Sequence, residues 1–154
     1  MRPDPMVLDG CYSCTVESSG ELPSWQRIVV TDHWRVVHAF NSSLLGWLVV
    51  LPRRHIESLA ELEPEAAAAL GPLLTDLTSA LQKVTGCQKT YVMLFAEAEG
   101  FAHLHIHVVP RMADQPEDER GPQIFARLDR PEGERVPEVD RKRVADEIGE
   151  ALGR

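Results

Sequence analysis

The chain has 154 residues, 44% of them hydrophobic and 26% charged, which is the composition of an ordinary globular domain and excludes a chain that is disordered throughout. Its formal net charge of −8 argues against a broad basic surface, so we expect no nucleic-acid or membrane partner, while a local phosphate site stays compatible with this charge. No apolar run reaches the roughly 18 residues of a transmembrane helix, and the N-terminus MRPDPMVLDG lacks a signal-peptide core, so we expect a cytoplasmic protein.

The first third of the chain predicts a loop followed by three strands. Residues 1–24 are polar and turn-rich, so we expect a loop, and it carries two cysteines at C-x-x-C spacing. The segments 25–30 and 34–40 are rich in β-branched and aromatic residues and predict a hairpin. The short apolar run 46–52 ends in proline and predicts a central strand.

A long amphipathic helix is predicted next. Pro64 favours the helix start, leucines follow at spacings of three and four, and Gly86 favours the helix end. Two further strands, 89–95 and 102–110, are joined by a short link and should be antiparallel neighbours. These elements predict an α+β fold, an antiparallel sheet of about five strands with one long helix packed on it.

The composition changes after residue 111, where Pro, Asp, Glu and Gly dominate until about residue 138 and a short terminal helix is predicted to follow. We therefore divide the chain into a domain of residues 1–111 and a C-terminal extension of residues 112–154. The apolar cluster of this extension, within residues 119–128, could fold back over the functional site or over a dimer partner.

Three of the six histidines, His103, His105 and His107, alternate with apolar residues in FAHLHIHVVPR. Alternate residues of a strand share one face, so the three imidazoles should line one pocket while their neighbours enter the core. A polar strand face without function is a weak explanation, because histidine is uncommon and the alternation is strict. From the residues alone two functions stay open: a metal clamp, and a phosphate pocket in which neutral imidazole is a nucleophile or a donor.

These histidines make the sequence resemble the histidine triad (HIT) superfamily of nucleotide hydrolases and transferases. HLHIHVV (103–109) fits the family pattern of three histidines alternating with apolar residues, and GWLVVLPRRHIESLAEL (46–62) resembles a second family block. The resemblance runs from about Cys11 to Arg111. It implies a HIT-like sheet, a small-molecule nucleotide substrate and a homodimer.

The resemblance also implies roles for two histidines. His105 would attack the α-phosphorus of a nucleotide ester, anhydride or phosphoramidate and form a covalent nucleotidyl-histidine, which water or a second acceptor would resolve. His107 would bind a non-bridging phosphate oxygen or the leaving group. The chain would then be a hydrolase or a nucleotidyl transferase.

The spacing of Cys11 and Cys14 indicates metal or redox chemistry, and a redox C-x-x-C usually opens a helix in a βαβ setting that we do not expect here. Zinc-containing branches of the superfamily carry two cysteines in this position. They complete the site with histidines that correspond to His55 and His103, so the resemblance implies a structural Zn²⁺ held by these four residues. The other cysteine and histidines outside the triad are expected to be core or surface residues: Cys87, His33 and His38.

The sequence departs from the family pattern around the expected substrate. Trp47 stands where nucleotide-processing members carry a histidine that orders the triad or the phosphate, so it either fills space or walls the pocket. Asn41 is our candidate for the ribose hydroxyls, and Arg111 for a phosphate. Glu97 and Glu99 precede the triad, where carboxylates would weaken phosphate binding unless they point away or bind a cation.

Two alternatives to the enzyme stay open. The departures are compatible with a nucleotide-binding or regulatory module that has lost efficient turnover. In the second alternative the triad holds a catalytic zinc, which requires a carboxylate ligand or an open coordination position.

Overall fold

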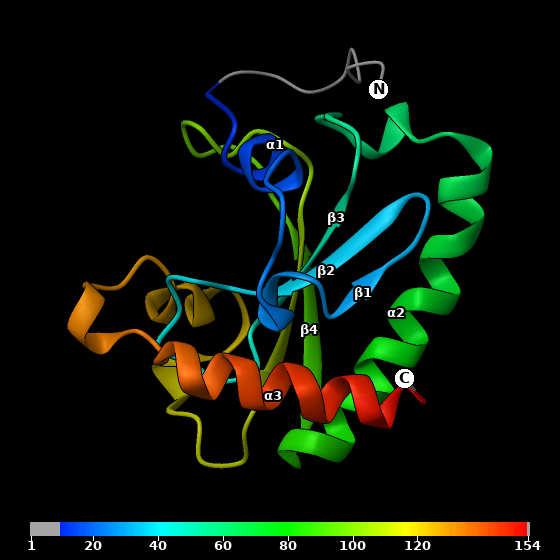
Figure 1. Cartoon of the computed structure of the whole chain (residues 1–154). Helices are drawn as coiled ribbons and strands as arrows, with labels where there is room; N and C mark the ends of the chain where they lie inside the picture. The colour runs from blue at the N-terminus through cyan, green and yellow to red at the C-terminus, as the bar shows by residue number, and fades with distance from the viewer. Residues whose placement is uncertain (1–9, 154) are drawn as a thin grey trace.

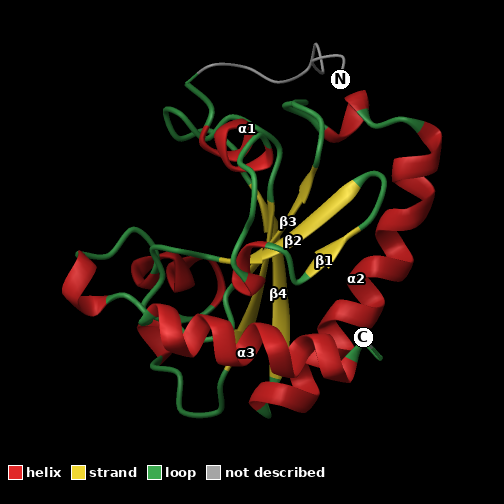
Figure 2. Cartoon of the chain, in the orientation of Figure 1, coloured by secondary structure: helices red, strands yellow, loops and turns green. Residues whose placement is uncertain are grey.

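The strands form one antiparallel sheet in the order β1-β2-β3-β5-β4. A computed structural model of the chain describes residues 10–153, and none of the helices in that range is both long and apolar enough to cross a membrane. Figures 1 and 2 show the strands at the centre, with α2 along one side and α3 crossing the front. The predicted α+β fold is confirmed. The elements are α1 Tyr12–Glu17, β1 Val29–Val30, β2 Trp34–His38, β3 Leu48–Pro52, α2 Pro64–Thr85, β4 Lys89–Leu94, β5 Ile106–Arg111 and α3 Glu138–Ala151.

The long helix α2 has the ends that the sequence predicts. Pro64 occupies its first position, where the missing N–H has no partner to lose. Gly86 ends it with a left-handed φ of 71°, and the Gly86 N–H donates to the carbonyl of Gln82 at 2.9 Å. Helix α2 therefore has a fixed length and a defined exit toward β4.

Two helices, rather than the one expected, cover the first face of the sheet. Both α2 and α3 contact the strands and each other. Helix α3 has this place because Val144, Ala145 and Ile148 form its apolar side and are buried in the same cluster as Val108 of β5. The cluster also includes Val36, Val50, Ile106, Leu77 and Leu81.

The opposite face of the sheet carries a second apolar cluster. Val109 belongs to it whereas Val108 belongs to the first cluster, as expected for successive residues of a strand. Ile124, from the segment between β5 and α3, is fully buried in this second cluster beside Trp47. Residues beyond the predicted boundary at 111 therefore pack into both faces of the sheet.

Strand β5 begins at Ile106, four residues later than predicted, so His103 and His105 lie in the segment that leads into it. The neighbouring β3 ends at Pro52, which has no N–H to donate to the ladder. The Pro52 carbonyl instead accepts a hydrogen bond from His103 Nε2 at 2.7 Å. A side chain thus replaces the backbone pairing that would have extended the strand.

Candidate active site and metal centre

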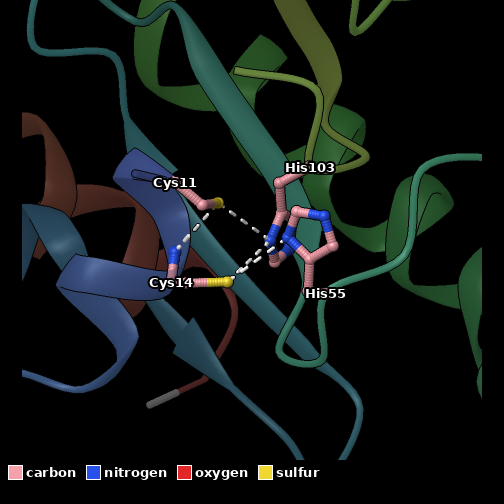
Figure 3. A group of neighbouring side chains, drawn as sticks. All are labelled: Cys11, Cys14, His55 and His103. Atoms are coloured by element: carbon pink, nitrogen blue, oxygen red, sulfur yellow. Dashed lines mark hydrogen bonds between the residues drawn. The ribbon is translucent and has the colours of Figure 1, made fainter. Parts of the chain in front are cut away.

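Four sulfur and nitrogen donors meet beside the end of β3. Cys11 and Cys14 come from the start of α1, His55 from the loop after β3, and His103 from the approach to β5. Figure 3 shows the four side chains pointing toward one another, and their ligand atoms all lie within 4.8 Å of each other. Cys14 Sγ lies 3.4 Å from His55 Nδ1 and 3.6 Å from His103 Nδ1, and Cys11 Sγ lies 3.6 Å from His103 Nδ1. All four residues are buried.

These separations fit a structural zinc site. A tetrahedral Zn²⁺ with bonds of about 2.3 Å to sulfur and about 2.0 Å to nitrogen places sulfur and nitrogen about 3.5 Å apart. Two thiols and two imidazoles supply the four ligands that such a site uses. Burial excludes the water that would compete for a coordination position. The geometry therefore agrees with the zinc assignment that the resemblance implied.

The far nitrogen of each ligand histidine has its own acceptor. His103 Nε2 donates to the carbonyl of Pro52 at 2.7 Å, and His55 Nε2 donates to the carboxylate of Glu57 at 2.8 Å. Both rings therefore present an unprotonated Nδ1 to the thiols, as metal ligands must. Burial lowers the pKa of His103, against an opposing effect of the hydrogen bond to Pro52, and this keeps the ring available for a metal.

The loop predicted around the cysteines is wrong, because they open the short helix α1. Cys11 is its N-cap, and its Sγ accepts the N–H of Cys14 at 3.3 Å, a role that the sequence pattern did not reveal. This helix precedes an antiparallel sheet, so the βαβ setting of redox C-x-x-C motifs is missing from residues 10–153. The two histidines beside the thiols favour metal binding instead.

A cavity of about 460 Å³ lies next to the metal centre, and His105 and His107 line it. Its walls come from β2 and β3, from residues 95–101 of the link between β4 and β5, and from residues 125–129 beyond β5. The cavity is of the size in which small ligands bind. Tyr12 and Phe40 stack at one part of its wall, with ring centroids 4.9 Å apart.

A hydrogen bond to the backbone fixes which ring nitrogen of His105 carries a proton. His105 Nδ1 lies 2.8 Å from the carbonyl oxygen of His103, and a carbonyl can only accept, so Nδ1 carries the proton. In the neutral form of the ring the lone pair is then on Nε2, and this side chain lines the cavity. This arrangement suits a nucleophile or a general base.

His107 is buried among rings, with 5% of its surface exposed. The rings of His105 and Phe125 stand edge-on to it, with centroids 5.0 and 5.1 Å away. Burial, together with the charge of His105, lowers the pKa of His107 to about 3. His107 is therefore neutral near pH 7.

Of the two predicted substrate residues outside the triad, the structure brings one to the cavity and leaves the other out. Asn41 lines the cavity, as do the carboxylate residues Glu97 and Glu99. Arg111 does not, because β5 runs away from the triad and its pairing places Arg111 opposite Lys89. The five residue-to-residue steps from Ile106 to Arg111 span about 16 Å at the usual strand rise. Arg111 is close to the triad in sequence but distant from it in the structure.

The segment beyond residue 111 supplies wall residues that the sequence did not assign one by one. Phe125, Leu128 and Asp129 line the cavity, so within this chain the apolar cluster of the extension packs against the cavity that His105 and His107 line. The apolar residues within 119–128 indicated that Phe125 and Leu128 would be buried or packed against another surface. No sequence pattern pointed to Asp129, which has a positive φ of 53°.

Within residues 10–153, one group of at least three histidine, cysteine, aspartate or glutamate side chains is close enough together to hold a metal, and it is the Cys11, Cys14, His55 and His103 group. His105 and His107 are outside it. Among the described residues, a catalytic zinc held by the triad would therefore have no carboxylate ligand and would need the open coordination position instead.

Comparison with known proteins agrees with this geometry. The HIT domain family model matches residues 20–114, more than half of the chain, beginning after the two cysteines. A zinc-bound histidine triad family protein from Mycobacterium smegmatis is 19% identical over 93% of each chain, with a TM-score of 0.65. A histidine triad protein from Sinorhizobium meliloti is 23% identical over 81% of this chain and 87% of its own, also with a TM-score of 0.65.

A uridylyltransferase shares the fold as well, at 19% identity and a TM-score of 0.65, over 93% of this chain and 45% of that protein. No curated protein sequence matches the chain. Structural similarity at these identities shows a common fold, whereas the family model reads the sequence itself. The chain belongs to the histidine triad (HIT) family.

Proposed function

We propose that the chain is a nucleotide hydrolase or nucleotidyl transferase that works through a covalent nucleotidyl-histidine at His105. The observation that carries this proposal is the 2.8 Å hydrogen bond from His105 Nδ1 to the His103 carbonyl. It leaves the Nε2 lone pair for the substrate, in a cavity of about 460 Å³. The shared fold with a uridylyltransferase supports nucleotidyl chemistry as the reaction class.

In the first step, the His105 Nε2 lone pair forms a bond to the α-phosphorus. The bond from phosphorus to the leaving group breaks, and its electron pair departs with that group. The positive charge that develops on the His105 ring is met by the His103 carbonyl through the Nδ1–H. Water or another acceptor then attacks phosphorus, and the electron pair of the nitrogen–phosphorus bond returns to Nε2. The proton that this acceptor loses to solvent balances the proton that the leaving group takes from solvent.

His107 is the proposed donor to the phosphoryl group. It lines the same cavity, and its ring centroid lies 5.0 Å from that of His105. A neutral imidazole can donate one hydrogen bond to a non-bridging oxygen as negative charge builds there. The pKa of His107, lowered to about 3, keeps it from becoming a second cation in the site.

Zinc, when bound, would act on structure rather than on the reaction. His103 is both a donor of the Cys2His2 group and the residue whose carbonyl orients His105. Fixing the His103 side chain therefore also fixes the backbone that holds the nucleophile. This links α1 to the reactive centre.

The rest of the cavity supports a nucleotide of moderate size. Tyr12, Phe40 and Phe101 offer aromatic surface for a base, and Asn41 is our candidate for the ribose hydroxyls. Glu97 and Glu99 are exposed and line the cavity, so they oppose the charge of a polyphosphate tail. This favours substrates with a weakly charged leaving group, such as phosphoramidates.

The test is to supply an adenosine phosphoramidate and diadenosine polyphosphates and to follow AMP release by chromatography. We expect release by the wild type and background levels from His105→Asn, with zinc content and circular dichroism unchanged. His33→Asn is the matched control, since it removes a histidine from the turn between β1 and β2. Equal rates for the wild type and His105→Asn would refute the proposal. Tight nucleotide binding without AMP release would replace it with the binding-module alternative.

A further inference from the structure

Trp47 makes a hydrogen bond into the triad. Its indole Nε1 lies 3.0 Å from Nδ1 of His107, and the two rings stand at 87° with centroids 5.6 Å apart. Trp47 is fully buried and is not among the residues that line the cavity. It therefore acts on His107 from behind, on the side away from a ligand.

The chemistry of the two rings fixes the direction of this bond. An indole nitrogen can only donate, so Nδ1 of His107 must be the acceptor. A neutral imidazole carries one proton, which then resides on Nε2. Protonating Nδ1 would bring two N–H groups face to face in a buried place, which agrees with the low pKa of His107.

The backbone around Trp47 holds the donor in place. The Gly46 N–H donates to His38 Nε2 at 2.9 Å, and the Trp47 carbonyl accepts the N–H of Ala39 at 2.9 Å. Gly46 has a φ of 92°, and a Cβ there would lie 3.2 Å from side-chain atoms of Pro110 and Thr85. The turn that aims Trp47 therefore depends on glycine.

An aromatic ring that packs against both partners completes the arrangement. The ring of Phe125 meets both Trp47 and His107, with centroid distances of 5.5 and 5.1 Å. Phe125 belongs to the segment beyond β5, so that segment helps to fix the pair. Among the described residues, Trp47 is the hydrogen-bond partner of the His107 ring.

We infer that Trp47 is a positioning residue that locks His107 as an Nε2–H donor facing the cavity. Its neighbour His105 has the opposite tautomer, with the proton on Nδ1 and the lone pair on Nε2. The two adjacent imidazoles thus present one acceptor and one donor to the same ligand. The catalytic consequence rests on the proposed function, whereas the tautomer itself does not.

The first experiment is nitrogen-15 NMR of the histidine rings, which distinguishes a protonated from an unprotonated ring nitrogen. In the wild type at neutral pH we expect His107 to carry its proton on Nε2 alone. Trp47→Phe removes the donor and keeps an aromatic ring, so the proton should distribute over both nitrogens. A tryptophan analogue at position 47 with sulfur in place of the ring N–H serves if Phe prevents folding.

Trp34→Phe is the matched control. Trp34 is also fully buried, and its indole donates at 2.9 Å to the carbonyl of Ala66, in the first apolar cluster. The Trp34→Phe substitution removes the same kind of hydrogen bond but none that involves the triad, so the His107 tautomer should stay as in the wild type. Both variants are compared well below their unfolding temperatures.

Turnover gives the second readout. Loss of the Trp47 donor should lower kcat for AMP release by about tenfold or more, with a smaller change in KM, because an outer hydrogen bond acts most where charge develops. Trp34→Phe should keep kcat within about twofold of the wild type.

Two results would overturn the inference: a wild-type His107 protonated on Nδ1, or a Trp47→Phe variant whose tautomer and kcat equal those of Trp34→Phe. Failure of the proposed function is separate, since it appears as AMP release by His105→Asn. The NMR result would stand in that case.

Discussion

Lowering the pH should destabilise the fold through His38, a fully buried histidine at the end of β2. Its Nδ1 donates to the carbonyl of Ala39 at 2.8 Å, and its Nε2 accepts the N–H of Gly46 at 2.9 Å. Protonation would place the second hydrogen of the ring on Nε2, so that this N–H would face the N–H of Gly46 and the hydrogen bond would be lost. Burial lowers the pKa of His38 to about 4 from its ordinary value of 6.5, although the hydrogen bond to Ala39 opposes this shift.

The sign and size of the effect follow from these two pKa values. The unfolded chain takes up the His38 proton near pH 6.5 and the folded chain only near pH 4, so acid favours unfolding between them. The contribution is complete above pH 6.5 and is lost as the pH falls toward 4. At about 1.4 kcal/mol per pH unit, His38 should remove about 2.5 kcal/mol from the free energy of unfolding by pH 4.5.

Urea denaturation of the wild type and of His38→Gln, at pH 7.5 and at pH 4.5, measures this contribution. Glutamine can still accept the Gly46 N–H but does not titrate, so its free energy of unfolding should fall by about 2.5 kcal/mol less than that of the wild type. The comparison cancels losses common to both proteins, including those from the metal donors. His33→Gln is the control for removing one histidine.

Parallel pH profiles for the wild type and His38→Gln would refute the reasoning, since His38 would then bind protons equally in the folded and unfolded chain. A steeper profile for the variant would refute it as well.

Other predictions concern the metal centre, the cavity and the C-terminal segment. Glu57→Gln weakens the acceptor of His55 Nε2, so zinc affinity in a competition with a coloured chelator should fall by about 10- to 100-fold while the fold persists. Replacing Glu97 and Glu99 by Gln should lower KM for an anionic nucleotide by about two- to fivefold in low salt, and an equal gain in high salt would contradict this. Ile124→Ala should cost about 2–5 kcal/mol in urea denaturation because the side chain is fully buried, and a cost below about 0.5 kcal/mol would show that the segment is dispensable.

The sequence predicted best where a single residue type decides the backbone. Pro64 and Gly86 lie at the two ends of α2 as expected. The alternation of His107 with Ile106 and Val108 gave the two faces of β5 correctly, whereas His103 and His105 precede the strand. The zinc donors were identified through the family resemblance, because Cys11 and His103 are 92 residues apart and no local pattern relates them.

The remaining features depend on tertiary contacts. A thiol that caps a helix, a carbonyl of Pro52 that takes a histidine N–H, and a hydrogen bond from Trp47 to His107 leave no periodic trace in the sequence. Packing of α3 onto the sheet was missed because most residues of this helix are polar and only a few apolar residues form its buried side. Arg111 was placed by its proximity in sequence to the triad, which strand direction overrides.

The covalent step at His105 is tested most directly by trapping the intermediate. The protein is mixed with an adenosine phosphoramidate and quenched within one turnover at alkaline pH, because a nitrogen–phosphorus bond to imidazole breaks in acid. Mass spectrometry of the peptide that contains the triad should find one adenylyl group, located on His105 and missing from His105→Asn. AMP formation with no adduct, or an adduct on His107, would contradict the account.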